Sequence, residues 1–226
     1  MSESFSVPDP RSLSDLRVYL SRAGRIEDGS IRIVAGSGVL AVYCAILYPR
    51  GLLDHTPTVL GLRTFATDPA AAFDAVVPSR SMLDRLIRLE NAGHAEAAEI
   101  AVTLPLQVST VTWAGISPPR GGWYSVGEIA VGVLSAAAAA GIEEIATTVP
   151  AETGEPLARH TRAEVWSRPL SRLDYVPAGA AFAAFSLGFL ADATEVVTVF
   201  ETGPWTRLTL RRGHVLVRRP DWSLQG

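Results

Sequence analysis

The sequence predicts an α+β protein whose N-terminal half is a mostly antiparallel sheet with flanking helices, and whose C-terminal half is a helical lobe ending in a three-strand meander. Short alternating apolar runs with turn residues between them dominate the first half. Helical spacing and alanine-rich stretches dominate the middle of the second half, and alternation returns at the end. We therefore expect a sheet-rich lobe over 1–112, a connecting loop over 113–123 and a helical lobe over 124–226.

The first half contains two amphipathic helices among its strands. Helices are predicted to start at Ser12, with an end at Gly24, and at Ser81. Gly36-Ser-Gly38 predicts a hairpin turn, because glycine adopts positive φ without strain. Residues 1–10 are polar, and we expect no regular structure there. The predicted strands cover residues 30–35, 39–47, 58–66, 73–77, 100–104 and 108–112.

The second half should begin with a helix. Ser125 and Glu128 have the spacing of a capping box, so this helix should run to Ala140 with Gly141 just past its end. The alternative is that residues 141–149 continue the helix after a kink. A charged helix is predicted over 153–168. Pro177 suits the first turn of an apolar helix that follows it. The predicted terminal meander consists of strands at 195–201, 205–211 and 214–218.

The basic residues are unusual, because the 226-residue chain has 20 arginines and no lysine. Without lysine there is no Schiff-base chemistry, no P-loop of the Walker type and no kinase strand lysine. The formal net charge is −3, which disfavours a general nucleic-acid or anionic-membrane binder. Hydrophobic residues make up 48% of the chain, which indicates a large core, an oligomer interface or both.

Cysteine and histidine give no support for a disulfide or a metal site. Cys44 is the single cysteine, which fits a reducing compartment, and residues 1–10 do not resemble a signal peptide. The apolar stretches fall short of the length of a membrane span, so we expect buried helices. The four histidines have no metal-binding spacing. We expect a cytoplasmic protein with no metal and no cofactor.

The segment from Trp113 to Trp123 is the sharpest local feature. Its prolines and glycines oppose regular structure, and Arg120 lies between the two tryptophans. Stacking of arginine on tryptophan, beside a predicted helix N-terminus, could bind a small carboxylate or phosphate. Trp113, Arg120 and Trp123 are therefore the candidate ligand-binding residues. The alternative is an inter-lobe linker anchored to the core by its tryptophans.

Catalysis has one weak pair of candidates, Asp54 and His55, in a loop between two strands. A histidine beside a carboxylate can titrate near neutral pH. Together with Arg120 they could serve a metal-independent enzyme that acts on a small molecule by acid–base chemistry. The alternative is an Asx-type turn before Thr56 and Pro57.

Five arginines gather in the terminal meander. A strand face with arginines, near Trp205 and Trp222, could stack on and neutralise nucleic acid. The alternative is a solvated strand face paired with acidic helices, which the net negative charge favours. The candidate nucleic-acid residues are Arg207, Arg211, Arg212, Arg218 and Arg219.

The sequence favours a non-catalytic binding or assembly module inside the cell. It would use the loop 113–123, and its partner would be another protein or a second copy of the chain. A small anion could bind at Arg120. The acid–base enzyme and the nucleic-acid accessory protein remain the two alternatives, and whether the chain is an enzyme stays open.

Overall fold

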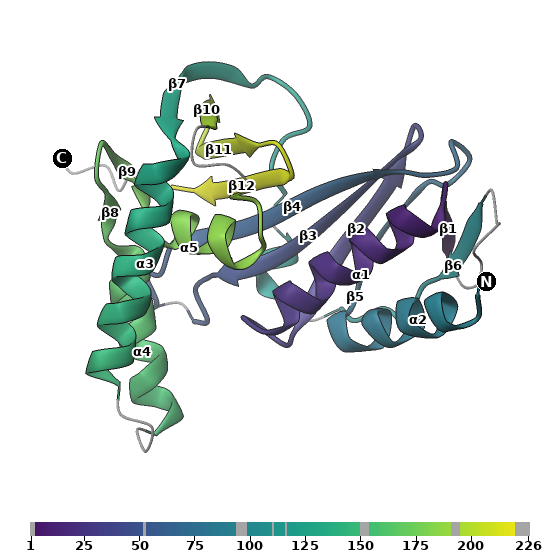
Figure 1. Cartoon of the computed structure of the whole chain (residues 1–226), viewed down its shortest axis with the longest axis horizontal. Helices are drawn as coiled ribbons and strands as arrows, with labels where there is room; N and C mark the ends of the chain where they lie inside the picture. The colour runs from purple at the N-terminus through teal and green to yellow at the C-terminus, as the bar shows by residue number, and fades with distance from the viewer. Residues whose placement is uncertain are drawn as a thin grey trace. The chain divides into compact units, whose positions relative to one another are not determined.

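The computed structural model describes residues 3–51, 53–93, 99–109, 111–115, 117–149, 154–190 and 195–219. The chain forms two compact units, and each is made of two stretches of chain (Figure 1). Unit 1 comprises Met1–Ala45 and Leu62–Ile116, and unit 2 comprises Ile46–Gly61 and Ser117–Gly226. Residues 46–61 thus cluster with unit 2, although they lie within the predicted first lobe. The lobe boundaries themselves stay a prediction.

Unit 1 combines a sheet with two helices. Its strands follow the order β5-β2-β3-β4, and β2 is antiparallel to both of its neighbours. The division between the two units falls within β3 and within β4. In chain order the elements are β1 (Ser4–Val7), α1 (Pro10–Gly24), β2 (Ser30–Gly36), β3 (Val39–Leu47), β4 (Thr58–Ala66), β5 (Phe73–Pro78), α2 (Ser79–Asn91), β6 (Ile100–Thr103) and the 3₁₀ turn η1 (Thr112–Gly115).

The predicted hairpin between β2 and β3 is confirmed. Ser37 and Gly38 both have positive φ, at 52° and 77°, which is the conformation of a tight two-residue hairpin turn. The first helix starts earlier than predicted, at Pro10, and Asp9 is its N-cap. The Asp9 carboxylate accepts a hydrogen bond of 2.8 Å from the amide of Ser12. A proline in the first turn with a capping Asp before it is therefore the true start signal.

Two further predictions in unit 1 were wrong. Residues 4–7, expected to be irregular, form β1, which pairs antiparallel with β6 in a separate two-stranded sheet. The strand predicted over 108–112 does not form in its described part: Val108 donates one backbone bond of 2.8 Å to Val76, and Thr112 already belongs to η1. Whether each of these segments forms a strand depends on its backbone pairing with a distant segment, which the local sequence does not indicate.

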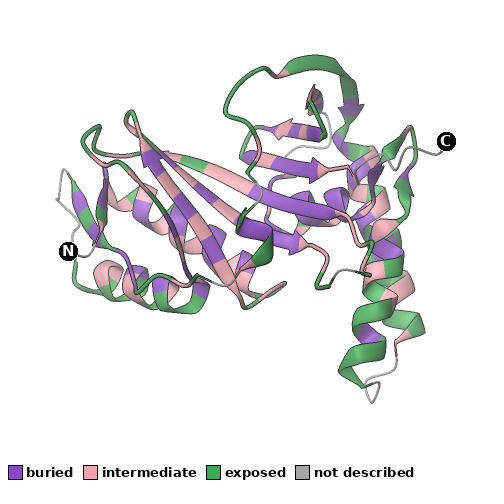
Figure 2. Ribbon diagram, turned by 180° about the vertical axis from the view of Figure 1, so that it is seen from behind, coloured by how far each residue is buried: buried purple, intermediate pink, exposed green. Residues whose placement is uncertain are grey.

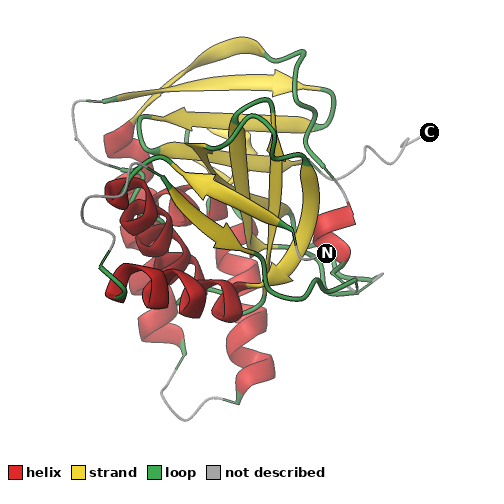
Figure 3. Cartoon of the chain, turned by 90° about the vertical axis from the view of Figure 1, so that its right-hand side faces the viewer, coloured by secondary structure: helices red, strands yellow, loops and turns green. Residues whose placement is uncertain are grey.

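Unit 2 also combines a sheet with helices; strands are yellow and helices red in Figure 3. Its strand order is β4-β12-β11-β10-β7. The terminal meander predicted from the sequence is confirmed as β10, β11 and β12. In chain order the elements are β7 (Tyr124–Ala130), α3 (Val131–Thr148), α4 (Glu155–Ser167), β8 (Pro169–Leu170), β9 (Leu173–Pro177), α5 (Gly179–Ser186), β10 (Val196–Thr202), β11 (Trp205–Leu210) and β12 (Gly213–Arg218).

The predicted capping box at Ser125 and Glu128 was wrong. Both residues lie in β7, which pairs antiparallel with β10, and the helix starts only at Val131. Pairing with β10 outweighs the local capping signal. Of the two predicted helix ends, the one at Gly141 was wrong, and the continuation past Gly141 is confirmed, because α3 runs to Thr148.

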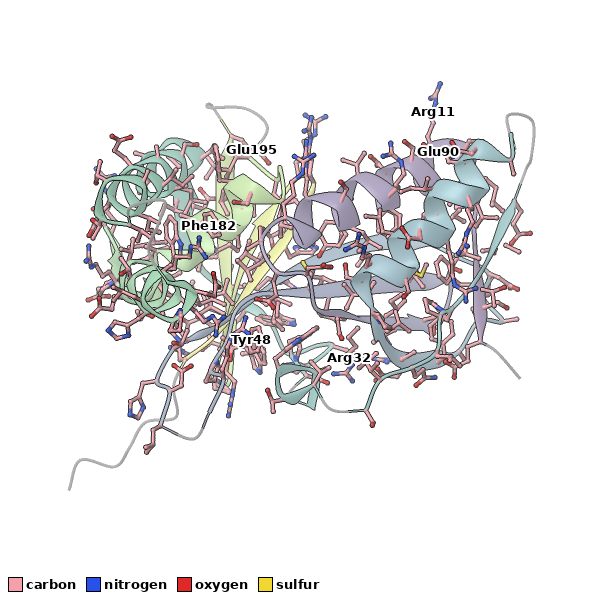
Figure 4. All side chains as sticks on the ribbon, turned by 90° about the horizontal axis from the view of Figure 1, so that it is seen from below. Arg11, Arg32, Tyr48, Glu90, Phe182 and Glu195 are labelled. Carbon is pink, nitrogen blue, oxygen red and sulfur yellow. The ribbon has the colours of Figure 1, made fainter. Side chains whose placement is uncertain are left out.

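Gly141 has a packing role inside α3. The ring of Trp166 on α4 occupies the space in which a Cβ at Gly141 would lie. Trp166 also stacks on Phe182 of α5, with ring centroids 4.4 Å apart; Phe182 is labelled in Figure 4. α5 begins at Gly179, so the prediction of Pro177 in its first turn was wrong, because Pro177 ends β9.

The fold class is confirmed as α+β, with a large antiparallel sheet and a C-terminal strand meander. Among the described helices, α3 alone is long and apolar enough to cross a membrane by length and composition. Core helices of soluble proteins meet the same two criteria. In α3 the buried residues are Val131, Leu134, Ala138 and Gly141.

Candidate binding site on the C-terminal sheet

The sheet of unit 2 has two unlike faces. One face is apolar and buried, and it packs against α5 through β12. At this contact the ring of Phe189 occupies the space in which a Cβ at position 213 would lie, so glycine fits there. We call the opposite side the open face. Trp205 and Leu216 are buried on this face. The strand register gives it the side chains of Ser125, Glu128, Ala130, Val196, Thr198, Phe200, Thr202, Trp205, Arg207, Thr209, His214, Leu216 and Arg218.

Strand register places these side chains together. Directly opposed residues of antiparallel strands share a face. Phe200 opposes Arg207, while Thr198 opposes Thr209, and Thr209 in turn opposes His214. Thr209 and His214 are in hydrogen-bond contact, with Oγ1 and Nδ1 3.2 Å apart.

Arg207 is at the centre of the open face. Its guanidinium carbon lies 4.6 Å from the centroid of the Trp123 ring and 4.6 Å from that of Phe200. Both distances are within cation–π range. Trp123 comes from the loop before β7, and its indole N–H donates to the carbonyl of Pro119 at 3.0 Å. The aromatic end of the predicted loop and one arginine of the meander therefore form one cluster.

The Arg207 guanidinium has no hydrogen-bond acceptor among the described residues. Its side chain is half-buried, and Nε is buried without a hydrogen-bond partner among the described residues. No described carboxylate lies within ion-pair distance of it. Burial lowers the pKa of Arg207 from its ordinary value, and no neighbouring negative charge opposes this shift. An arginine side chain remains charged at neutral pH all the same.

His214 lies in the same partly buried, positively charged environment as Arg207. Burial, and then the positive charge of Arg207, lower the pKa of His214 to about 4. The imidazole is therefore neutral at neutral pH. A neutral imidazole and the Thr209 hydroxyl can each donate or accept a hydrogen bond next to the guanidinium.

The other predicted ligand-binding residues lie apart from this cluster. Trp113 belongs to unit 1, where it is buried in η1. Arg120 is exposed, and no described residue pairs with it. The helix N-terminus expected beside Arg120 is absent from the described structure at that point, because β7 follows the loop.

Among the other arginines of the meander, Arg218 shares the strand face of Arg207, because it opposes Trp205 in the register. Arg211 and Arg212 are exposed in the turn between β11 and β12. Arg219 donates to the carbonyl of Gly203 at 2.8 Å, and its guanidinium lies 3.6 Å from the carboxylate of Glu201. Arg218, the last of the five, is half-buried at the end of β12. Nucleic-acid binding by these residues as a group stays a prediction.

Asp54 and His55 lie in a loop of unit 2. The Asp54 carboxylate accepts backbone bonds from Arg50 at 2.8 Å and from Thr56 at 2.9 Å, which is the geometry of an Asx-type turn. These hydrogen bonds lower the pKa of Asp54, against the opposing effect of its burial. His55 is exposed. No described hydrogen bond or ion pair joins either residue to Arg120, and a catalytic role for them stays a prediction.

Metal-binding side chains are not grouped in the described part of the chain, where no three His, Cys, Asp or Glu side chains are placed to hold one ion. His94 and Trp222 lie outside the described residues. Cys44 is buried, with its sulfur 3.1 Å from the Tyr19 hydroxyl.

A family model described as "Domain of unknown function (DUF8010)" matches residues 1–114, half of the chain. The chain belongs to the DUF8010 family. A second model, "Domain of unknown function (DUF8185)", matches residues 118–222. No curated protein matches the sequence.

The fold of this DUF8010 chain resembles that of bacterial sliding clamps. DNA polymerase III subunit beta from Borrelia burgdorferi matches with a TM-score of 0.53 at 9% identity, over 98% of this chain and 66% of that one. The DNA polymerase sliding clamp from Bacillus subtilis matches with a TM-score of 0.52 at 11% identity, over 98% and 65%. The clamp from Caulobacter crescentus matches with a TM-score of 0.51 at 10% identity, over 99% and 67%. The DUF8010 chain thus spans about two thirds of the length of these chains, and the likeness concerns the fold alone.

Sequence reasoning about the DUF8010 chain missed two features of the site. It did not include Phe200 or His214 among the candidates, and it assigned the residues of β7 to a helix. The alternation of Thr198 with Phe200 and of Arg207 with Thr209 is visible in the sequence, and it places each pair on one strand face. The register between the strands, which brings Phe200 opposite Arg207, was the missing information.

Proposed function

We propose that this chain is a non-catalytic, clamp-like binding module that assembles with copies of itself and acts at DNA through protein partners. The likeness in fold to proteins named as sliding clamps and polymerase subunits supports the class. The proposal includes an intracellular setting, which a single buried cysteine favours.

The observation that carries self-assembly is the exposure of β7, the terminal strand of the unit 2 sheet. β7 pairs with β10 on one side and has no partner strand on the other among the described residues. All of its residues except Ile129 are exposed (Figure 2). An edge strand with free backbone groups is a ready template for pairing with another strand.

Apolar side chains on and beside β7 favour a second copy of the chain as the occupant. Tyr124 is 58% exposed, Val126 is 42% exposed, and Val196 on the neighbouring strand is 52% exposed. Strand pairing between copies would cover these groups and satisfy the free backbone groups of β7 in one contact. A self-complementary edge produces closed dimers when the same strand pairs with itself.

The test is the molar mass in solution as a function of concentration, measured by light scattering and sedimentation. The wild-type chain should form a defined oligomer. The double variant Tyr124→Glu/Val126→Glu should shift it toward monomer, because it places two charges on the edge. Val39→Glu is the matched control, since Val39 is 46% exposed at the start of a strand in unit 1. A wild-type chain that is monomeric at every concentration would overturn self-assembly.

Direct binding of DNA by the arginines is not part of the proposal. The chain has a net charge of −3, and binding of nucleic acid normally depends on several cations aligned along the phosphate backbone. Salt-dependent binding of the isolated chain to duplex or single-stranded DNA, lost on neutralising Arg211 and Arg212, would contradict this part of the proposal.

A further inference from the structure

Arg207 is an anchored cation with no carboxylate beside it in the described part of the chain. The rings of Trp123 and Phe200 hold its guanidinium, and Nε is already out of contact with water. The cost of removing water from the charge is therefore partly met in the free protein, before any ligand binds. An acceptor that arrives here meets a pre-oriented donor fork in a poorly hydrated setting, where an ion pair is stronger than on an open surface.

The neighbours of Arg207 suit an oxygen acceptor. Thr198 and Thr209 present hydroxyl groups on the same face, and His214 is neutral at neutral pH. These groups can bond a bound oxyanion or the backbone beside it, and they add no competing negative charge. The aromatic rings offer apolar surface around the charge, which suits a peptide side chain better than a free ion.

We infer that Arg207 binds a carboxylate presented by an acidic segment of a partner protein. The inference deepens the proposed protein-binding function, because it names the chemistry that the partner would present. A planar guanidinium binds a carboxylate through two parallel hydrogen bonds, which gives direction as well as affinity. The open face would then select partners by an acidic residue next to an apolar one.

Charge on the open face favours a peptide over nucleic acid. Glu128 opposes Thr198 on the same face and is exposed, so it would repel a phosphate backbone running across the strands. A segment that presents one carboxylate to Arg207 carries fewer negative charges across this face than a phosphate backbone does. Arg219 is already engaged by Glu201 and the Gly203 carbonyl, and Arg218, which shares the open face, also takes part in a contact within the chain, so these two arginines add little free positive charge nearby.

The test is fluorescence anisotropy of labelled hexaglutamate titrated with the full chain, at low salt and neutral pH. Hexaglutamine of the same label and length is the uncharged control peptide. Arg207→Gln should weaken hexaglutamate binding by about tenfold or more, the loss of about 1.4 kcal/mol that a charge-assisted contact represents. Arg207→Lys should also weaken it, because lysine keeps the charge and loses the planar fork.

Arg162→Gln is the matched control variant, because Arg162 is an exposed arginine of unit 2 on α4 and its loss changes the net charge equally. It should leave binding within about twofold of wild type. Equal binding by wild type and Arg207→Gln would overturn the inference. So would a single-stranded oligothymidylate that binds more tightly than hexaglutamate and depends on Arg207, since the site would then belong to nucleic acid.

The result is separable from the test of self-assembly. Arg207→Gln should retain the molar mass of the wild-type oligomer, because β7 is unchanged. An intact oligomer that never binds hexaglutamate would refute the carboxylate site and leave the proposed assembly standing. A monomer that binds hexaglutamate through Arg207 would do the reverse.

Discussion

Two arginines on sheet strands of this chain have opposite surroundings. Arg32 on β2, labelled in Figure 4, donates from Nε and Nη2 to the two carboxylate oxygens of Asp74 at 2.7 and 2.5 Å, and from Nη1 to the Ala114 carbonyl at 2.8 Å. Arg207 on β11 contacts two aromatic rings and no described carboxylate. The hydrogen bonds to Asp74 raise the pKa of Arg32, whereas burial lowers that of Arg207. Arg32 therefore connects β2 to β5 and to η1 within unit 1, whereas the charge of Arg207 is available to a partner molecule.

The largest expected effect is on stability, and it separates the two arginines. Arg32→Gln should lower the free energy of unfolding by about 1–2 kcal/mol, because it removes three charge-assisted contacts of a partly exposed pair. Arg207→Gln should change it by less than about 1 kcal/mol, since the lost cation–π contacts are offset by removal of a poorly solvated charge. Urea denaturation of both variants beside wild type checks this. Equal losses would mean that Arg207 is a structural residue like Arg32.

The second prediction concerns pH. The pKa of His214 is about 4 in the folded chain and near 6.5 in a free histidine. Between these values the unfolded chain binds a proton that the folded chain excludes, so this group makes stability fall as pH falls from 6.5 to 4. Below pH 4 its contribution no longer changes.

The matched measurement is urea denaturation of wild type and His214→Gln at pH 7.5 and at pH 5. The variant should lose less stability between these two values, because glutamine does not titrate. His55→Gln serves as the control for the replacement of a histidine by glutamine, at an exposed position. The same pH slope in wild type and His214→Gln would contradict the burial of His214 beside a cation.

The third prediction concerns a substitution that places a carboxylate near Arg207, as Asp74 lies near Arg32. Thr209→Glu places an acid on the same strand face, two residues along from Arg207 and opposite His214. It should raise the pKa of His214, because a nearby negative charge favours the imidazolium, and should weaken hexaglutamate binding several-fold by competition. Histidine NMR titration and anisotropy measure the two effects. Thr209→Gln is the control, because glutamine has nearly the size of glutamate and no charge.

Much of the fold could be predicted from the sequence, and the reasons are local. The alternation of apolar residues located β2 to β5 and the terminal meander, and glycine located the hairpin turn at Ser37 and Gly38. Errors arose where distant segments decide. β10 recruits Ser125 and Glu128 into a strand, and Trp166 requires a glycine at position 141 in the middle of a helix. In neither case does the local sequence record the distant partner.

The candidate site was predictable only in part, for the same reason. Trp123 and Arg207 were both singled out, each within a different feature of the sequence. Their contact depends on how the loop before β7 meets β11, which spacing along the chain does not encode. Trp113 and Arg120 were grouped with Trp123 by nearness in sequence, yet Trp113 is buried in unit 1 and Arg120 is exposed.

The most direct test of the central contrast observes the two guanidinium groups themselves. The Nε–Hε resonances of Arg32 and Arg207 can be followed by NMR in the ¹⁵N-labelled chain while hexaglutamate is added, with assignments from the Arg32→Gln and Arg207→Gln variants. We expect the Arg207 resonance to shift in proportion to the peptide bound and the Arg32 resonance to stay in place. A fixed Arg207 resonance at saturating peptide would contradict it.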